Sequence, residues 1–365
     1  MPVAIVADAC VVPRGPAPDD DLWGLLMRGE TLLRPRPHLG VDAPASTFEP
    51  EFAGHAALAL ASAALCKVWP AFCDLPGRPA LFIATTKGDL DDWLADHGAR
   101  PGFEAFEAGL NDMFSGLPRE RRTVSNACVS GAQAAIEAAE MLIDGECDRA
   151  LVVGADGVAP FVAQGFKALQ GLSPGGARPF DAARDGLSLG EAGCAVILRR
   201  SADAPRAPRM AGWGCSNDAN HISGPSRDGS GLALAMARAL SGLDRSRVVA
   251  VCGHGTGTLY NDAMEARAFH TTFSGRVPPV FGVKGSIGHT LGAAGLIELA
   301  LSARAARTGE IPPTAGFCNG EAEFELDVVH GGPRRIRPGA VLTTNSGFGG
   351  MNTAIIVDPG DAWPA

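Results

Sequence analysis

The chain has 365 residues, of which 46% are hydrophobic and 19% are charged, and its formal net charge is −9. This length and apolar content suffice to bury a large core, so the composition excludes a disordered chain. The acidic balance, without a long basic run, excludes a nucleic-acid or anionic-membrane binder that depends on an extended basic surface.

Nine cysteines are scattered along the chain and form no C-x-x-C pair, which argues against a zinc site and against a disulfide framework. This pattern favours a reducing, cytoplasmic compartment. The N-terminal apolar run contains Asp8 and lacks a basic leader, so we expect a first strand there instead of a signal peptide. We expect no stretch that is long and apolar enough to span a bilayer.

Strand-like runs recur along the whole chain, and alanine-rich helical patterns lie between several of them. After the first run, residues 13–50 are rich in Pro, Asp and Gly, which predicts a surface loop around a short helix. The alternation is typical of an α/β fold with buried sheets. We expect strands at residues 3–12, 80–86, 149–156, 193–200, 247–255, 279–285, 340–346 and 352–359.

Two of the predicted helices, at 132–144 and 290–307, resemble each other: each opens on a glycine-containing turn and is followed by Gly-Glu. Repetition at about half the chain length predicts a duplicated α/β unit. We expect an N-terminal half at 1–205 and a C-terminal half at 206–365. The charged, proline-rich segment 199–210 is the expected link between them.

Four glycine-dense stretches follow strand-like runs, and one of them, SNACVSG, carries Cys128 just before a helix. In α/β sheets such turns are where ligands collect, and glycine lets backbone N–H groups approach a reacting atom. Cys128 is either one more buried filler or a nucleophile. In the second case the N-terminus of the helix is expected to lower the pKa of the thiol.

Two histidines lie in the other glycine-dense stretches, His254 between glycines and His289 at the opening of a helix. An imidazole that faces a helix N-terminus stays neutral, so its N–H can donate to a developing oxyanion without being a strong acid. We expect Lys284, five residues before His289, to be either a surface lysine or a buried partner of Asp262 or Glu265 that orients the histidines.

Taken together, these motifs closely resemble the β-ketoacyl-acyl carrier protein synthases, over residues 120 to 357 and in the family's order. The resemblance implies the thiolase fold, two similar α/β halves in a five-layered α-β-α-β-α arrangement, usually as a dimer. The motifs that carry it are NACVSG with Cys128, SPGGARPFDAARDGLSLGEAG at 173–193, HGTGTLYNDAME with His254, VKGSIGHTLGAAG with Lys284 and His289, IPPT at 311–314, and NSGFGGMN.

The resemblance also implies a decarboxylative Claisen condensation, for fatty acid or polyketide biosynthesis. Cys128 would take an acyl group from a carrier-protein thioester, while His254 and His289 support decarboxylation of a malonyl unit. Backbone N–H groups of Cys128 and Phe348 would form the oxyanion hole. The remaining residues that the resemblance assigns are Phe348 as the acyl gate, Lys284 as a member of the catalytic network, and Asp262, Glu265 and Asn345 as supporting residues.

No metal and no cofactor on this chain are expected, because decarboxylation itself supplies the carbanion and the phosphopantetheine arm belongs to the acyl carrier protein. We expect that partner to dock on a local basic patch, since carrier proteins are generally acidic. The two candidate patches are Arg119, Arg121 and Arg122, and Arg334, Arg335 and Arg337.

The chain departs from the family pattern in three places. NSGFGG lacks the first aromatic residue of the usual glycine-rich end, Leu259-Tyr260 replaces Pro-Leu, and the part before Cys128 is shorter. These departures favour a specialised synthase, as a homodimer or as one half of a heterodimer with a related chain. Two alternatives remain on this fold: a chain-length-factor-like partner subunit and a Cys-dependent acyltransferase. A nucleotide-binding α/β protein is disfavoured, because the sequence has no P-loop.

Overall fold

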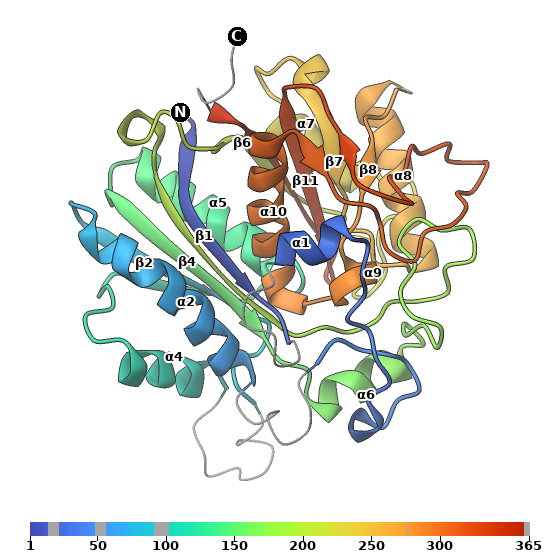
Figure 1. The fold of residues 1–365 in the computed structure, drawn as a ribbon, viewed down its shortest axis with the longest axis horizontal. Coiled ribbons are helices and arrows are strands. Elements are labelled where there is room, and N and C mark those ends of the chain that lie inside the picture. The colour runs from blue at the N-terminus through green and yellow to red at the C-terminus, as the bar shows by residue number, and fades with distance from the viewer. Residues whose placement is uncertain (14–21, 48–55, 91–101, 275, 361–365) are drawn as a thin grey trace.

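The computed structural model describes residues 1–13, 22–47, 56–90, 102–274 and 276–360. In these residues ten strands form one large sheet, which consists of two sets of five (Figure 1). The first set has the order β3-β2-β4-β5-β1, made of β1 (Val3–Val11), β2 (Pro79–Ala84), β3 (Arg121–Val124), β4 (Arg149–Asp156) and β5 (Ala192–Arg200).

The second set repeats this order as β8-β7-β11-β12-β6. In each set three neighbouring strands are parallel, and the fourth strand is antiparallel to the neighbours on both its sides. β1 and β6 join the sets through the pairs Val3–Met210 and Ala4–Arg209. The strands are β6 (Arg209–Asn217), β7 (Val248–Cys252), β8 (Val280–Phe281), β11 (Ala340–Gly347) and β12 (Met351–Asp358).

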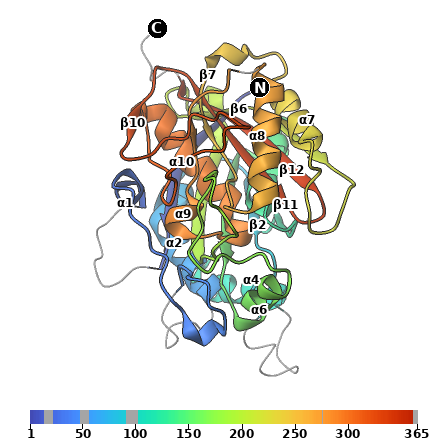
Figure 2. The ribbon, with the colours of Figure 1, turned by 90° about the vertical axis from the view of Figure 1, so that its right-hand side faces the viewer.

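Helices cover both sets of strands and fill the space between them. The two inner helices, α5 (Ser130–Ile143) and α10 (Ala294–Thr308), pack on each other and on both sets (Figures 1 and 2). Outer helices cover the far faces: α2 (Ala56–Asp74) and α4 (Gly102–Met113) on one side, α7 (Ser230–Ala239) and α8 (Leu259–Phe273) on the other. The elements outside these layers are α1 (Leu22–Met27), α6 (Pro160–Ala168), α9 (Lys284–Ile287), β9 (Glu310–Ile311) and β10 (Arg334–Arg335).

The core follows these layers, because alternate residues of a strand point to opposite faces of the sheet. Along β5, Cys194, Val196 and Leu198 join the central cluster around α5 and α10, whereas Ala195 and Ile197 join the outer cluster under α2. A third cluster lies between the second set and α7 and α8. The predicted five layers with two similar halves are therefore confirmed, while the boundary between residues 205 and 206 stays a prediction.

The expected strands and helices are present, with four differences. The strand expected at 279–285 is only two residues long, β8, and Lys284 already begins α9. The link between the halves is shorter than predicted, because β5 runs to Arg200 and β6 already begins at Arg209. β3 was not predicted, since Arg121–Val124 reads RRTV and has no apolar pattern. The second inner helix begins at Ala294, after a 3-10 turn at Leu291–Ala293, and the loop expected at 13–50 lies partly outside the described residues.

The prediction that no stretch is long and apolar enough to cross a bilayer is wrong for α2. By length and composition this helix of 19 residues qualifies, and half of its most apolar window is buried. Leu60, Ala61 and Leu65 on its buried face are at most 1% exposed and pack over β4 and β5. This packing is typical of a core helix in an α/β protein.

The two inner helices approach closely, because glycines lie at their crossing. A Cβ atom on Gly131 would come within 2.7 Å of the backbone nitrogen of Leu296, and one on Gly295 within 2.8 Å of Ala132. Backbone atoms there cannot yield as a flexible side chain would. The crossing therefore holds the start of α5 against the start of α10.

We expect Gly131→Ala to lower the free energy of unfolding by about 1–3 kcal/mol, because the added methyl group forces the two helices apart. Gly165→Ala in exposed α6 is the matched control: a Cβ there meets nothing within 4 Å, and the change should stabilise by about 0.5–1 kcal/mol. Urea unfolding measures both. Equal stabilities of Gly131→Ala and the wild type would contradict the close crossing.

Candidate active site

A cavity of about 280 Å³ opens between the two halves of the molecule. Its base contains three of the predicted catalytic side chains, Cys128, His254 and His289, each at most 7% exposed. Its mouth contains exposed apolar side chains. The other lining residues are Phe166, Leu169, Gln170, Gly171, Asp185, Gly186, Leu187, Ser223, Gly224, Pro225, Thr256, Thr258, Leu259, Tyr260, Asn261, Ser346, Gly347 and Phe348.

Cys128 lies in a tight turn between β3 and α5. Ala127 before it has a φ of 47°, in the left-handed region that residues other than glycine rarely adopt. The Ser130 hydroxyl holds this turn: it accepts from the Asn126 N–H at 2.8 Å and donates to the Ala127 carbonyl at 2.6 Å. The turn thereby aims the thiol at the cavity instead of into the sheet.

His289 meets the thiol from the other half of the chain, with its Nε2 atom 3.0 Å from the Cys128 sulfur. Its backbone is fixed to the segment GLSLGEAG at 186–193, which is part of a resembling motif. The His289 N–H donates to the Ser188 carbonyl, and the His289 carbonyl accepts from the Gly190 N–H. Burial and the nearby Lys284 hold the pKa of His289 well below its usual range. The imidazole is therefore neutral, as predicted.

The expectation of an acidic thiol is wrong. Burial raises the pKa of Cys128 to about 12, while the Lys284 charge and a hydrogen bond from the Phe348 backbone N–H act in the opposite direction without reversing it. The resting pair of Cys128 and His289 is thus neutral on both sides. The thiolate forms when the sulfur loses its proton to a base within reach, and His289 Nε2 is in that position.

His254 lies beside His289, with the ring centroids 5.1 Å apart and the planes nearly perpendicular. Its Nδ1 atom faces two donors, the Lys284 ammonium at 3.2 Å and the Asn345 amide at 3.3 Å. Nδ1 must accept, because an ammonium has no lone pair. Nε2 therefore carries the proton and is the donor available to the cavity; burial, Lys284 and His289 keep the pKa of His254 well below its usual range.

Lys284 pairs with a residue that the sequence analysis missed. Its ammonium donates to the Glu298 carboxylate and to the His254 carbonyl, and Glu298 also accepts from the Asn345 amide at 2.5 Å. The predicted pairing of Lys284 with Asp262 or Glu265 is wrong. Glu298 could have been found as the single acid within the apolar run LIELAL at 296–301 of the second inner helix.

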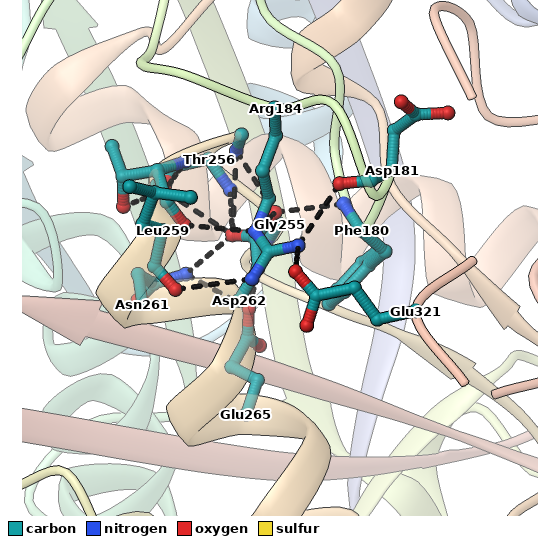
Figure 3. Close-up of polar contacts among 12 residues, drawn as sticks. Phe180, Asp181, Arg184, Gly255, Thr256, Leu259, Asn261, Asp262, Glu265 and Glu321 are labelled. Atoms are coloured by element: carbon teal, nitrogen blue, oxygen red, sulfur yellow. Dashed lines mark hydrogen bonds and ion pairs between the residues drawn. The ribbon is translucent and has the colours of Figure 1, made fainter. Parts of the chain in front are cut away.

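Asp262 and Glu265 instead hold the backbone of the His254 loop (Figure 3). Glu265 accepts from the N–H groups of His254 and Gly255, both at 2.7 Å, and Asp262 accepts from the Thr256 N–H at 3.0 Å. Burial raises the pKa of Glu265 to about 7, and the Asp262 charge adds to this shift. Both acids are positioning groups, and neither lies against Lys284.

Arg184 is a second buried charge that the sequence analysis did not single out. It lies between Asp262 and Glu321 in Figure 3, donates to Glu321 at 2.6 Å, and donates to the carbonyls of Asp181 and Leu259. It belongs to ARPFDAARDG, one of the resembling motifs. The arginine therefore fastens that motif to the start of α8, where the His254 loop ends.

Aromatic and apolar side chains surround the mouth. Phe348, predicted as the acyl gate, is 39% exposed and its ring centroid lies 5.7 Å from that of Phe166. Tyr260, which replaces a leucine of the family pattern, is 57% exposed and has the Arg227 guanidinium 4.5 Å from its ring centroid. The gate role stays a prediction, and Arg227 is an arginine that contacts the lining at the mouth.

The six arginines of the two predicted docking patches do not line the cavity. Several have acidic neighbours on the surface: Arg122 with Glu146, Arg334 with Asp327, and Arg335 with Glu310 at distances of 2.6 to 3.7 Å. Exposed ion pairs of this kind contribute little to stability but reduce the local positive charge. Carrier docking on either patch stays a prediction.

We expect alkylation of Cys128 by iodoacetamide to accelerate about tenfold per pH unit between about pH 7 and pH 10, without a plateau. The reason is that the thiol pKa of about 12 leaves a thiolate fraction that keeps rising over this range. Peptide mass spectrometry separates Cys128 from the exposed Cys66, the internal reference. A plateau near neutral pH would instead indicate the helix-activated thiol that the sequence suggested.

Residues 112–204 match the β-ketoacyl synthase N-terminal domain, and residues 208–318 match the C-terminal domain of the same family, together more than half of the chain. A 3-oxoacyl-(acyl-carrier-protein) synthase 2 of Mycobacterium leprae is 35% identical over 249 residues, 64% of this chain and 59% of that protein.

A ketoacyl synthase alpha subunit of the tetracenomycin polyketide synthase, from Streptomyces glaucescens, is 34% identical over 250 residues, again 64% of this chain and 59% of that protein. The matched part of the chain thus spans less than two thirds of the length of these relatives.

Solved structures extend the likeness over nearly the whole chain. A β-ketoacyl synthase from Burkholderia phymatum has a TM-score of 0.84 at 26% identity and covers 98% of this chain and 99% of its own. The ishigamide ketosynthase/chain length factor has a TM-score of 0.83 at 26% identity, with 98% of both chains covered. With its thiolase fold and both matched domains in order, the chain belongs to the β-ketoacyl synthase family.

Proposed function

We propose that this chain is a β-ketoacyl-acyl carrier protein synthase that joins an acyl group to a malonyl unit with loss of carbon dioxide. The observation that carries the proposal is the contact of 3.0 Å between the Cys128 sulfur and His289 Nε2, in a cavity that His254 also lines. A nucleophile and two neutral imidazoles in one buried site are what a thioester condensation needs.

In the first half of the reaction Cys128 gives its proton to His289 Nε2, and the sulfur attacks the carbonyl carbon of the acyl thioester. Backbone N–H groups of Cys128 and Phe348 stabilise the oxyanion; the Phe348 N–H already donates to the sulfur. The carbon–sulfur bond to the carrier arm then breaks, and the arm leaves as a thiol with the proton from His289. The acyl group remains on Cys128.

In the second half the malonyl thioester loses carbon dioxide, and the electron pair of the broken carbon–carbon bond forms an enolate. The Nε2–H of His254 donates to its oxygen, and His289 donates as well in the tautomer whose proton lies on Nε2, the nitrogen that faces Cys128. Neutral donors suit this step, because they stabilise the enolate without protonating its carbon. The carbanion attacks the acyl carbonyl, the Cys128 sulfur leaves, and the product is a ketoacyl chain two carbons longer.

The substrates come as thioesters on a partner acyl carrier protein, whose phosphopantetheine arm supplies the thiol. No cofactor held by this chain enters either half. We also propose a dimer, with itself or with a related ketosynthase-like chain. A cytoplasmic location is part of the proposal, and it is supported by nine free cysteine thiols.

The alternatives on the same fold are a chain-length-factor-like partner subunit and a Cys-dependent acyltransferase. One of the similar structures is named a ketosynthase/chain length factor. A silent partner has no use for a thiol in contact with an imidazole, and an acyltransferase without decarboxylation has no use for the second imidazole. Cys128, His254 and His289 in one cavity therefore favour the condensing enzyme.

We expect Cys128→Ala to abolish acyl transfer and condensation while malonyl-carrier decarboxylation survives. His254→Ala should reverse this bias, with Cys128 still acylated and decarboxylation lowered roughly 10²–10⁴-fold, the scale for losing one positioned group, whereas His289→Ala should slow both halves because His289 is also the base for Cys128. Intact-mass measurement of acylation and release of carbon dioxide are followed in parallel.

The same variants separate the alternatives. A silent partner subunit predicts that Cys128→Ala leaves the activity of the assembled complex intact. An acyltransferase predicts acylation of the wild type without release of carbon dioxide. Extended product from Cys128→Ala at the wild-type rate would falsify the nucleophile assignment.

For the carrier protein we expect Arg227→Glu to raise the KM for malonyl-carrier roughly tenfold at low salt with little change in kcat, because it reverses a charge beside Tyr260 at the mouth. Arg335→Glu is the matched control: Arg335 is an exposed arginine of β10 that does not line the cavity. A larger effect of Arg335→Glu than of Arg227→Glu would move the docking surface to the patch around β10.

A further inference from the structure

A fully buried carboxylate lies behind the active site, in a cluster that no catalytic step uses. Asp156 ends β4 and is 0% exposed, yet it accepts five hydrogen bonds. Oδ1 accepts from the Thr85 hydroxyl at 2.9 Å and from the Thr86 hydroxyl and the Lys87 ammonium, both at 3.0 Å. Oδ2 accepts from the N–H groups of Thr86 at 3.0 Å and Gly292 at 2.7 Å.

This cluster of Thr85, Thr86, Lys87 and Asp156 is bonded to both segments that carry the reacting pair. On the Cys128 side, the Ser125 hydroxyl donates to the Thr86 carbonyl at 3.0 Å. On the His289 side, Gly292 belongs to the turn that follows the imidazole, and a Cβ atom there would come within 2.7 Å of the Asp156 carboxylate. The carboxylate therefore joins the two segments from behind.

Both segments contain a residue in a strained backbone conformation. Ala127, next to Cys128, has a φ of 47°, and Leu291, two residues after His289, has a φ of 52°. Such conformations cost free energy and persist when surrounding contacts over-determine them. The hydrogen bonds from Ser125 and Gly292 to the cluster are contacts of this kind, one beside each strained residue.

The cluster also acts on the thiol through its charge. The Asp156 charge raises the pKa of Cys128, as does Glu298, while Lys284 lowers it, and the two facing imidazoles are neutral. Lys87, 14% exposed, forms an ion pair with Asp156 and also donates to the Gly157 carbonyl at 2.7 Å. Lys87 therefore offsets part of the negative charge behind the sulfur.

We propose that Lys87 and Asp156 are a positioning pair for the reaction: Asp156 fixes the His289 turn against Cys128, and Lys87 balances the carboxylate so that the sulfur can bear negative charge. The inference rests on the proposed function for its kinetic consequence. Its consequence for the free thiol does not depend on any substrate.

Two variants test the pair. In Asp156→Asn the negative charge is lost and the Gly292 contact is weakened, so alkylation of Cys128 at one pH should be faster by roughly three- to tenfold. Acyl transfer to Cys128 should at the same time be slower by roughly 10- to 100-fold, because His289 is misplaced. In Lys87→Met the carboxylate is uncompensated, so alkylation should be slower than in the wild type by roughly three- to tenfold.

The matched control is Asp148→Asn, since Asp148 directly precedes β4 at its other end and pairs there with Arg78 and Arg200. It should leave the alkylation profile unchanged. Near-ultraviolet circular dichroism reports whether each variant is folded; where Asp156→Asn does not fold, Lys87→Met alone decides.

Faster alkylation of Cys128 in Asp156→Asn and slower alkylation in Lys87→Met support the proposed role of the pair. This holds even if the protein condenses no substrate. A general loosening of the site would instead change alkylation in the same direction in both variants, and would overturn the inference. So would folded variants whose alkylation profiles superimpose on that of the wild type. Loss of condensation with normal opposite shifts counts against the proposed function and not against the pair.

Discussion

The close crossing of the two inner helices is the constraint on which the site depends. Gly131 and Gly295 let the backbones of α5 and α10 touch, and the turns that carry Cys128 and His289 lie at the starts of these helices. A larger residue at the crossing would push the two helix starts apart, and with them the Cys128 sulfur and the His289 imidazole. Packing and catalysis are thus set by the same few atoms.

The reacting side chains are also buried, and burial decides their protonation states. Burial raises the pKa of Cys128 and lowers the pKa values of His254 and His289, so these three side chains are neutral. The two charged side chains nearby, Lys284 and Asp156, therefore need partners of opposite charge. Glu298 offsets Lys284, and Lys87 offsets Asp156. Removing one member of such a pair is far more costly than removing both, because it leaves an uncompensated buried charge.

The site residues that lie in glycine-rich turns could be predicted from the sequence. The residues that reach the site only through the packing of distant elements could not. Cys128 and His289 follow from their glycine-rich turns before alanine-rich helices, and the repeat of those helices indicates the duplication. The partner of Lys284 could not be read from spacing, because Glu298 comes within range only when α10 packs beside α9. The strand at 121–124 was missed since a polar strand at the edge of a sheet has no apolar pattern. The expected pKa of the thiol was wrong because burial, which raises it, outweighs the Lys284 charge and the Phe348 N–H, which lower it.

Duplication explains why the two reacting groups face each other. Cys128 lies in the connection from β3 to α5, and His289 lies in the equivalent connection from β8 to the turn before α10. Each half therefore presents one such connection to the common centre, and a chain that kept one half would keep a nucleophile without its base. The second half adds His254 on the loop after β7, whose counterpart in the first half is the segment after β2 that contains Lys87. Equivalent positions thus carry different groups: an imidazole that lines the cavity in one half, and an ammonium that forms an ion pair with Asp156 in the other.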